Sequence, residues 1–325
     1  MAYVKMKISE FYGQKIYQIL ISQGYCMKEA QKLCDNGRII DNFGSVLKKN
    51  SIANGDIFLI DYRCEPKGLK PIFECKEFGV FDKPSGVLTH PNGRHCSYSL
   101  CDEIWSLWGK KACVAHRLDR ETSGVILVSK SQKTAIELKK MFENREIFKS
   151  YLAIVSGKID ANKFDKFRAE NYTDFVGKFG FLDSLDWLVI DKAMDITNDY
   201  DDIKTRMRIC ESGKRAVTLF RLINYEAKSD TSLIECVPLT GRQHQIRLHM
   251  FYVKHKILGD PIYGLERGDI ERILDGKMSE NERTQKSGAN RLMLHSNRLK
   301  FNYNGTEFDI SSKMKFGLSP FAQMD

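Results

Sequence analysis

The residue types best suited to chemistry gather in one short stretch, HRLDRETSG, at residues 116–124. The apolar run VILV follows it directly and is typical of a buried strand. Asp119 therefore lies at the mouth of a predicted strand between Arg117 and Arg120, whose positive charges oppose protonation of a carboxylate. Such an aspartate can attack an electrophilic carbon or stabilise a cation. A solvent-exposed turn, with Asp119 as a backbone cap and Gly124 in a tight bend, explains the same residues equally well.

A second side chain that could act with Asp119 is Arg247, in the segment HQIRLHM. Ile246 and Leu248 alternate there with polar residues, which predicts a strand with Arg247 on its polar face. A guanidinium on that face could hold Asp119 through two hydrogen bonds and keep it charged. A surface arginine that binds phosphate is the alternative interpretation.

Metal and cofactor chemistry find no support in the pattern of residues. The nine cysteines form no Cys-x-x-Cys pair, and His244 and His249, five residues apart, match no known zinc motif. Glycine-rich loops of the Walker or dinucleotide type are also absent from the sequence. We therefore expect no metal and no cofactor. A hydrolase built on Asp119 and these two histidines fits poorly, because no serine or cysteine nucleophile motif accompanies them.

Two groups of predicted elements would position these residues. In the first, residues 3–9 alternate like a strand, helices are predicted at 14–23 and 27–36, and strands at 38–40 and 57–62. The second of these strands follows a predicted turn at Asn54-Gly55-Asp56. Residues 63–71 are rich in proline, glycine and lysine and indicate a linker. Beyond it, strands at 78–81, 124–128 and 151–155 and a helix at 132–144 are predicted, while residues 158–214 show no clear period.

The composition limits the class of protein. A chain of 325 residues with 42% hydrophobic and 11% aromatic residues can form one large domain and an appendage. Its net charge of +9 favours a polyanionic partner, because Lys and Arg gain affinity by releasing counterions from phosphates. The N-terminus lacks the apolar run of a signal peptide, and no later run is long enough to span a membrane. We therefore expect a cytoplasmic protein with reduced cysteines.

The stretch HRLDRETSGVILVSKS resembles the signature of the RluA-type RNA pseudouridine synthases. Three further similar segments follow in the family's order: FGVFDKPSGVLTHP at 78–91, KSYLAIVSG at 149–157 and LTGRQHQIRLHM at 239–250. ILGDPIYG at 257–264 and RLMLHS at 291–296 also resemble family segments, so the likeness covers residues 73–303. Residues 10–62, with EAQKLCDNGRIIDN and NGDIFLIDY, are similar to the S-four-like RNA-binding domain found at the front of many RNA-modifying enzymes.

The resemblance implies a cofactor-free isomerase in which Asp119 is the catalytic residue, Tyr151 the active-site tyrosine and Arg247 the partner of the aspartate. We expect the substrate-binding residues to lie in or beside the similar segments: Lys83, Arg117, Arg120, Arg242, His244, Leu292 and Leu294. The two leucines would wall the pocket that retains the detached base.

The implied fold is α+β, with a mixed, largely antiparallel sheet, flanking helices and a central active-site cleft. The catalytic domain would span residues 73–325, with a poorly matched insertion at 158–214. Residues 1–65 would form a small α/β RNA-binding domain, followed by a linker at 66–72. The basic face of the small domain would carry Lys28, Lys32 and Arg38.

The expected substrate is uridine in large-subunit ribosomal RNA, and we expect the enzyme to be a monomer. Transfer RNA is the alternative substrate. A non-catalytic RNA-binding or ribosome-assembly factor that keeps the fold is the alternative function. The presence of Asp119, Tyr151 and Arg247 together argues against it, because a chain without catalysis would leave such groups free to drift.

Overall fold

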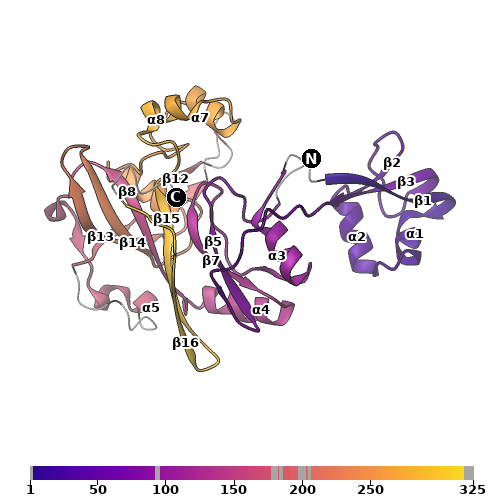
Figure 1. Ribbon diagram of the computed structural model, residues 1–325, viewed down its shortest axis with the longest axis horizontal. Coiled ribbons are helices and arrows are strands. Elements are labelled where there is room, and N and C mark those ends of the chain that lie inside the picture. The colour runs from indigo at the N-terminus through magenta and orange to yellow at the C-terminus, as the bar shows by residue number, and fades with distance from the viewer. Residues whose placement is uncertain are drawn as a thin grey trace. The chain divides into compact units, whose positions relative to one another are not determined.

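A computed structural model describes residues 3–91, 96–176, 182, 186–196, 203 and 206–317 of the chain (Figure 1). Contacts between residues divide the chain into two compact units. The first comprises Met1–Lys67 and His90–Ser106, and the second comprises Gly68–Thr89 and Leu107–Asp325. Each unit has its own hydrophobic core.

The first unit contains a three-stranded antiparallel sheet with the order β1-β3-β2. Its elements are β1 (Tyr3–Lys15), α1 (Ile16–Ser22), α2 (Met27–Asp35), β2 (Ile39–Asp41) and β3 (Ile52–Tyr62). The helices are amphipathic as predicted, because Ile19, Leu20 and Ala30 are fully buried in the core. Lys28 and Lys32 of α2 are exposed.

The turn predicted at residues 54–56 is wrong. These residues lie within β3, where Asn54, Gly55 and Asp56 are paired with β1. Gly55 has a φ of 123°, a backbone conformation that residues with a side chain rarely adopt. The glycine that signals a turn in the sequence therefore lets the strand bend locally while its pairing with β1 continues as far as Ile52.

The first residues of the predicted linker are fixed against α3 (Leu100–Trp108). Asp102, in the first turn of this helix, is fully buried. Its carboxylate accepts a 2.5 Å hydrogen bond from the hydroxyl of Tyr62 and a 2.8 Å hydrogen bond from the amide of Glu65. A buried carboxylate needs such donors, because without them it would lose its hydration uncompensated. The chain therefore leaves β3 as an ordered segment.

The second unit is built on an eleven-stranded sheet. The order along the sheet is β4-β5-β7-β15-β8-β14-β13-β10-β9, with β6 beside β7 and β16 beside β15. All these pairs are antiparallel except β7 with β15, so the predicted mixed, largely antiparallel sheet is confirmed. The strands are β4 (Phe73–Glu74), β5 (Phe78–Lys83), β6 (Cys113–Val114), β7 (Ser123–Ser129), β8 (Phe148–Ser156), β9 (Asp165–Lys166), β10 (Leu188–Asp191), β13 (Val217–Glu226), β14 (Thr231–Pro238), β15 (Leu294–Tyr303) and β16 (Thr306–Ser311).

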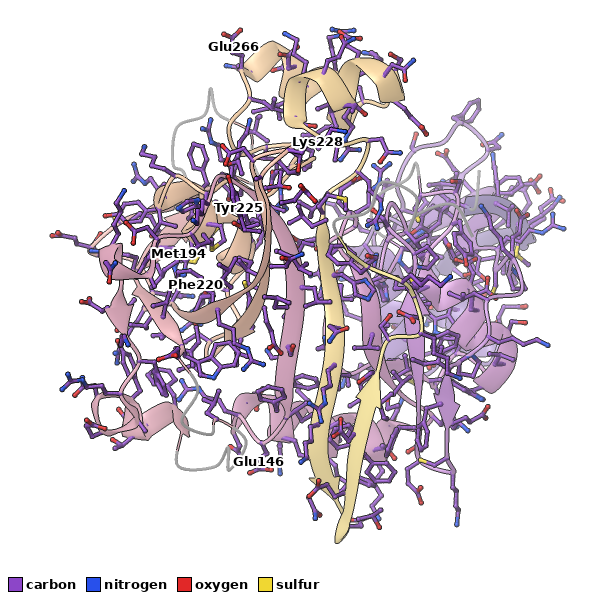
Figure 2. The ribbon with its side chains drawn as sticks, turned by 60° about the vertical axis from the view of Figure 1, so that its left-hand side comes forward. Glu146, Met194, Phe220, Tyr225, Lys228 and Glu266 are labelled. Carbon is purple, nitrogen blue, oxygen red and sulfur yellow. The ribbon has the colours of Figure 1, made fainter. Side chains whose placement is uncertain are left out.

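Helices flank this sheet, and their bounds are α4 (Gln132–Glu143), α5 (Thr173–Val176), α6 (Gln245–Tyr252), α7 (Arg267–Leu274) and α8 (Glu280–Ser287). Short 3-10 turns lie at Ala161–Lys163 and Ala169–Tyr172. Figure 2 shows Glu146, just before β8, and Lys228, in the turn between β13 and β14, at opposite ends of these strands. The weakly periodic segment 158–214 supplies β10 and the edge strand β9 of this sheet. It also forms a separate hairpin of β11 (Met194–Ile196) and β12 (Met207–Ile209), and the rest of it lies partly outside the described residues.

The strand predicted around Arg247 is wrong, because this segment forms α6. The alternation of polar and apolar residues misled the prediction, since every residue from Gln245 to Met250 is buried whatever its polarity. The polar members are accommodated by hydrogen bonds: His249, for example, contacts the hydroxyl of Thr218 at 2.9 Å. A helix buried on all sides has no amphipathic pattern to read.

Gly124 is the second residue of β7, at the point where β7 pairs in parallel with β15. The loop that carries Asp119 ends just before β7. A Cβ atom at this position would lie 2.1 Å from the carbonyl oxygen of Ser296, and the φ of Gly124 is 106°. Only glycine fits there without displacing β15. The residue thus allows the close strand pairing that holds the preceding loop in place.

Candidate active site

The loop that carries Asp119 is fixed on both sides of this residue. Before it, the hydroxyl of Thr89 donates to the carbonyl oxygen of Leu118 at 2.8 Å. After it, the ammonium group of Lys83 donates to the carbonyl oxygen of Arg120 at 3.1 Å. The Asp119 side chain between them is 29% exposed. The backbone is therefore anchored in the interior while the carboxylate remains accessible.

Arg247 pairs with Asp119, as predicted, but the geometry differs from the prediction. One hydrogen bond joins Nη1 of Arg247 to Oδ2 of Asp119 at 3.0 Å. The bidentate partner is instead Asp260, whose two carboxylate oxygens accept from Nε and Nη2 of Arg247 at 2.7 and 2.9 Å. The amides of Ile262 and Tyr263 donate to the same carboxylate at 2.8 and 2.9 Å. Asp260 therefore fixes the guanidinium, and its remaining nitrogen reaches Asp119.

Asp119, Arg247 and Asp260 form one cluster, in which opposite charges stabilise one another. Burial alone would raise the pKa of Asp260, but Arg247 and the two backbone amides hold it below its ordinary value. Burial alone would lower the pKa of Arg247, but Asp260 and Asp119 raise it above its ordinary value. Two carboxylates thus share one buried cation, and the cluster carries a net charge of about −1. Since Asp260 is 2% exposed, Asp119 is the carboxylate that a substrate can reach.

His244 also lies near Asp119, with its Nε2 3.8 Å from the Oδ2 atom that Arg247 contacts. Burial, with a further effect of Arg247, lowers the pKa of His244 to about 4. The imidazole is therefore neutral at pH 7 and forms no ion pair with Asp119. Its Nδ1 lies 3.2 Å from the hydroxyl of Tyr263, and its φ of 55° places it in the left-handed region just before α6.

Tyr151 lies in β8 between Cys236 of β14 and Ser296 of β15. Burial raises its pKa to about 12, against the opposing effect of a hydrogen bond with Ser296, and the charge of Asp119 also contributes. The tyrosine is therefore protonated at neutral pH. Its hydroxyl is suited to donate a hydrogen bond and its ring to contact a planar group.

Two lysines of the second unit have lowered pKa values. The Lys83 ammonium donates to the carbonyl oxygens of Pro84, Val87 and Arg120, and burial lowers its pKa to about 7. It is thus held in the interior as a support for the loop. Burial also lowers the pKa of Lys149, in β8, to about 8.

Similarity to known proteins shows the family of this chain. The family model described as RNA pseudouridylate synthase matches residues 77–251 of the chain. An RNA pseudouridine synthase of Helicobacter pylori strain J99, itself named as uncharacterised, is 35% identical over 296 residues, which are 91% of this chain and 90% of the relative. The chain belongs to the RNA pseudouridylate synthase family. It is an RNA pseudouridine synthase, an isomerase that acts on RNA.

Relatives with named substrates are more distant. The mitochondrial tRNA pseudouridine(32) synthase of Saccharomyces cerevisiae is 29% identical and matches 77% of this chain and 50% of that protein. Ribosomal large subunit pseudouridine synthase D of Nitrosomonas europaea is 27% identical and matches 62% of this chain and 52% of that protein. In fold, the chain is similar to the structure of human RNA Pseudouridylate Synthase Domain Containing 1, with a TM-score of 0.54, 21% identity and coverage of 76% of this chain and 85% of that one.

The other predicted residues of this pseudouridine synthase occupy two kinds of position. Arg117, Arg120 and Arg242 are exposed. The side chains of Arg120 and Arg242 reach the carbonyl oxygens of Gly86 and Arg215, both at 3.2 Å. Leu292 and Leu294 are buried, with 0% and 4% exposure. The arginines are therefore accessible to RNA, whereas the leucines belong to the interior next to β8.

Two residues of the synthase site were missed in the sequence, Asp260 and Tyr263. Both lie in ILGDPIYG, a segment whose likeness to the family is visible without indicating any role. Among the residues that the structure describes, no group of three His, Cys, Asp or Glu side chains could hold a metal ion. No helix in the described part of the chain is long and apolar enough to cross a membrane.

Proposed function

We propose that this enzyme converts uridine to pseudouridine in large-subunit ribosomal RNA and that Asp119 is its catalytic carboxylate. The observation that carries the proposal is the contact of 3.0 Å between the accessible Asp119 and the buried Arg247. Asp260 fixes the arginine from behind, so the orientation of Asp119 is set before substrate binds. Preorganised charge of this kind is a main source of catalytic rate enhancement.

The reaction requires the uracil to leave C1′ of the ribose through N1, to turn, and to rejoin C1′ through C5. In one route Asp119 attacks C1′, forming an ester bond as the N1 bond breaks, and the ester bond breaks when C5 rejoins. In the other, the carboxylate stabilises positive charge at the sugar while a proton leaves C2′ to give a glycal. In both routes C5 of uracil loses its proton to solvent or a base and N1 takes up a proton. In the glycal route C2′ also regains a proton when C5 rejoins C1′.

Tyr151 keeps its proton at neutral pH because its pKa is raised to about 12. This favours a role as a hydrogen-bond donor or as a surface on which the base stacks. In the glycal route, Tyr151 could take the sugar proton only as it passes its own proton on. The exchange for Phe separates these roles, because Phe retains the ring and removes the hydroxyl.

We propose that the target nucleotide is flipped out of the RNA, since a base held in a helix cannot be rearranged. Extrusion costs a few kcal/mol, which contacts with the flanking nucleotides must offset. Arg117 and Arg120 flank Asp119 and are exposed, so they are suited to grip neighbouring phosphates or to fill the space that the base leaves.

Residues 1–65 are proposed to act as an S-four-like RNA-binding domain that precedes the catalytic domain at 73–325. In support, Lys28 and Lys32 project from α2 as exposed cations, and Arg38 lies 4.1 Å from the ring centroid of Tyr3. Such cations increase RNA affinity by releasing counterions. A ribosomal substrate fits the name of the relative from N. europaea, and the yeast relative's name makes transfer RNA the alternative.

The test is to incubate the enzyme with unmodified large-subunit ribosomal RNA and transfer RNA and to map pseudouridine by carbodiimide-dependent reverse-transcription stops. We expect new stops on ribosomal RNA with the wild type and none with Asp119→Asn. Asp186→Asn is the matched control, because the Asp186 side chain is 92% exposed and should retain full activity. Stops on transfer RNA alone would change the substrate. Full activity of Asp119→Asn would overturn the catalytic assignment, and inactive wild type on both RNAs would favour the non-catalytic RNA-binding alternative.

A further inference from the structure

A surface cavity of about 650 Å³ lies beside α6, and of its lining residues only Tyr263 also belongs to the candidate active site. One wall comes from β12, another from the last turn of α6, and a third from Tyr263. The hairpin that forms the first wall is anchored in the second unit, because Met194 of β11 is 1% exposed and packs in one core cluster with Leu248 and Tyr263 (Figure 2). One wall of the cavity therefore comes from the segment 158–214, which matches no family motif in the sequence.

The lining of the cavity is positively charged. Arg206, Arg208 and Lys254 contribute to it, and none of the described lining residues is acidic. Arg208 and Lys254 are exposed. Lys192 adds a further cation nearby, with its ammonium nitrogen 5.7 Å from the ring centroid of Tyr252. Asp195 pairs with Arg208 across the hairpin and does not line the cavity. Such a concentration of cations is suited to phosphate groups.

Aromatic rings lie between these cations. Tyr252 is 44% exposed, which is a large fraction for a tyrosine at the end of a buried helix. Phe251 packs against Tyr263 with a centroid distance of 5.9 Å, so the two rings form a continuous apolar wall. Exposed aromatic rings among basic side chains are typical of sites that bind single-stranded nucleic acid, where bases stack on rings and cations follow the backbone.

The cavity shares Tyr263 with the catalytic cluster. The hydroxyl of this residue accepts a 3.1 Å hydrogen bond from the amide of Met207 in β12 and lies 3.2 Å from Nδ1 of His244. Its ring centroid lies 5.4 Å from the guanidinium carbon of Arg247. A nucleotide in the cavity would thus be separated from the Asp119 cluster by the thickness of one side chain.

We propose that this cavity binds unpaired nucleotides of the substrate RNA next to the target uridine, with a base stacked on Tyr252 and phosphates at Arg208 and Lys254. The inference rests on the proposed function in so far as the ligand is the substrate RNA. The proposal predicts that the enzyme prefers uridines in loops or at helix ends, because a flanking nucleotide must be unpaired to enter the cavity.

The experiment measures the binding of a fluorescein-labelled oligouridine of about twelve nucleotides to the full chain at several salt concentrations. Tyr252→Ala should weaken binding by about 5-fold to 150-fold, since stacking contributes about 1–3 kcal/mol per base. Tyr252→Phe, which keeps the ring, should bind like the wild type. The double variant Arg208→Gln/Lys254→Gln should lower the slope of log K against log salt by about 1.4, because each phosphate contact on a single strand contributes about 0.7.

Lys139→Gln/Lys163→Gln is the matched control, because it removes the same charge from side chains that are 73% and 78% exposed elsewhere. Its salt slope should equal that of the wild type. Unchanged affinity of Tyr252→Ala, or a salt slope of the cavity variant equal to that of the control, would overturn the proposal. Melting temperatures of the variants verify that each is folded.

Activity distinguishes this proposal from the proposed function. At saturating ribosomal RNA the cavity variants should retain the wild-type turnover and show a raised KM, because they leave Asp119 and Arg247 in place. If the wild type forms no pseudouridine on any RNA, the proposed function fails, while the oligouridine measurement still decides whether the cavity binds RNA.

Discussion

Asp119 and Asp260 share the guanidinium of Arg247, yet the structure predicts that replacing them affects the stability of the protein very differently. Asp260 is 2% exposed and Arg247 3% exposed, and two hydrogen bonds join them. Removing one partner of a buried ion pair costs about 3–5 kcal/mol, because the remaining charge is left uncompensated. Since Arg247 keeps its contact with Asp119, we expect Asp260→Asn to lower the free energy of unfolding by about 3 kcal/mol.

Asp119→Asn removes the charge from a side chain that is 29% exposed and that makes one hydrogen bond with Arg247. Solvent screens such a contact, and we expect a loss of about 1 kcal/mol or less. Asp119→Asn should therefore be folded, stable and inactive, whereas Asp260→Asn should be destabilised. The activity of Asp260→Asn should fall as well, because Arg247 is then free to leave the position that orients Asp119. In Asp260→Asn the side-chain amide oxygen can still accept from the backbone amides of Ile262 and Tyr263, so the loss of stability reports on the ion pair with Arg247.

The assay is urea unfolding at pH 7 of both variants and of Asp260→Asn/Arg247→Met. The double variant should recover part of the stability lost in Asp260→Asn, because it no longer buries an arginine with half of its partners missing. Equal destabilisation by Asp119→Asn and Asp260→Asn would refute this reasoning, as would a double variant that is less stable than Asp260→Asn alone.

Further predictions concern the tyrosine, the small domain and pH. Tyr151→Phe should lower turnover by about 100-fold or more at unchanged RNA affinity if the hydroxyl moves a proton, and normal turnover would leave the ring with a stacking role alone. Lys28→Gln/Lys32→Gln/Arg38→Gln should weaken RNA binding and lower the salt slope by about 2–3 while turnover at saturating RNA is kept, and an unchanged slope would contradict the proposed RNA-binding domain. The free energy of unfolding should fall as the pH falls from 6.5 toward about 4. In this window the unfolded chain protonates four histidines whose pKa values in the folded protein are only about 3 to 4. Each histidine should lower the free energy of unfolding by about 1.4 kcal/mol per pH unit. These histidines are His116, His244, His249 and His295, and equal melting temperatures at pH 7.5 and pH 5 would contradict the prediction.

Much of the fold could be predicted because its local signals are strong. The helix predicted at 132–144 is α4, with Asn144 as its C-cap, and Leu138 faces the core at 0% exposure. The run VILV is the buried centre of β7. In these elements the periodicity of apolar residues follows from one buried face or from full burial of a strand, and the sequence records either arrangement directly. Residues 54–56 contain the strongest turn signal of the first unit and yet lie in β3, because tertiary pairing with β1 overrides a local preference.

The pairing of Asp119 with Arg247 was predictable only through motif order, since 128 residues separate them. The segment around Arg247 was assigned to a strand because polar and apolar residues alternate in it. In α6 those polar residues are buried, and their partners come from distant parts of the chain, such as Thr218 for His249. No local pattern encodes such partners, because a buried polar residue and an exposed one look alike in a sequence.

Asp260 meets a general physical requirement of an arginine in this position. An arginine that orients a catalytic carboxylate must itself be held, since one exposed contact cannot fix a long, flexible side chain. If the arginine is also buried, its charge requires a second carboxylate in the interior. Asp260 supplies that charge and is fixed in turn by the amides of Ile262 and Tyr263, so the turn after Asp260 sets the position of Asp119 through two successive contacts. A buried arginine that orients the proposed catalytic aspartate therefore requires a third residue, and here the carboxylate of Asp260, in ILGDPIYG, meets that requirement.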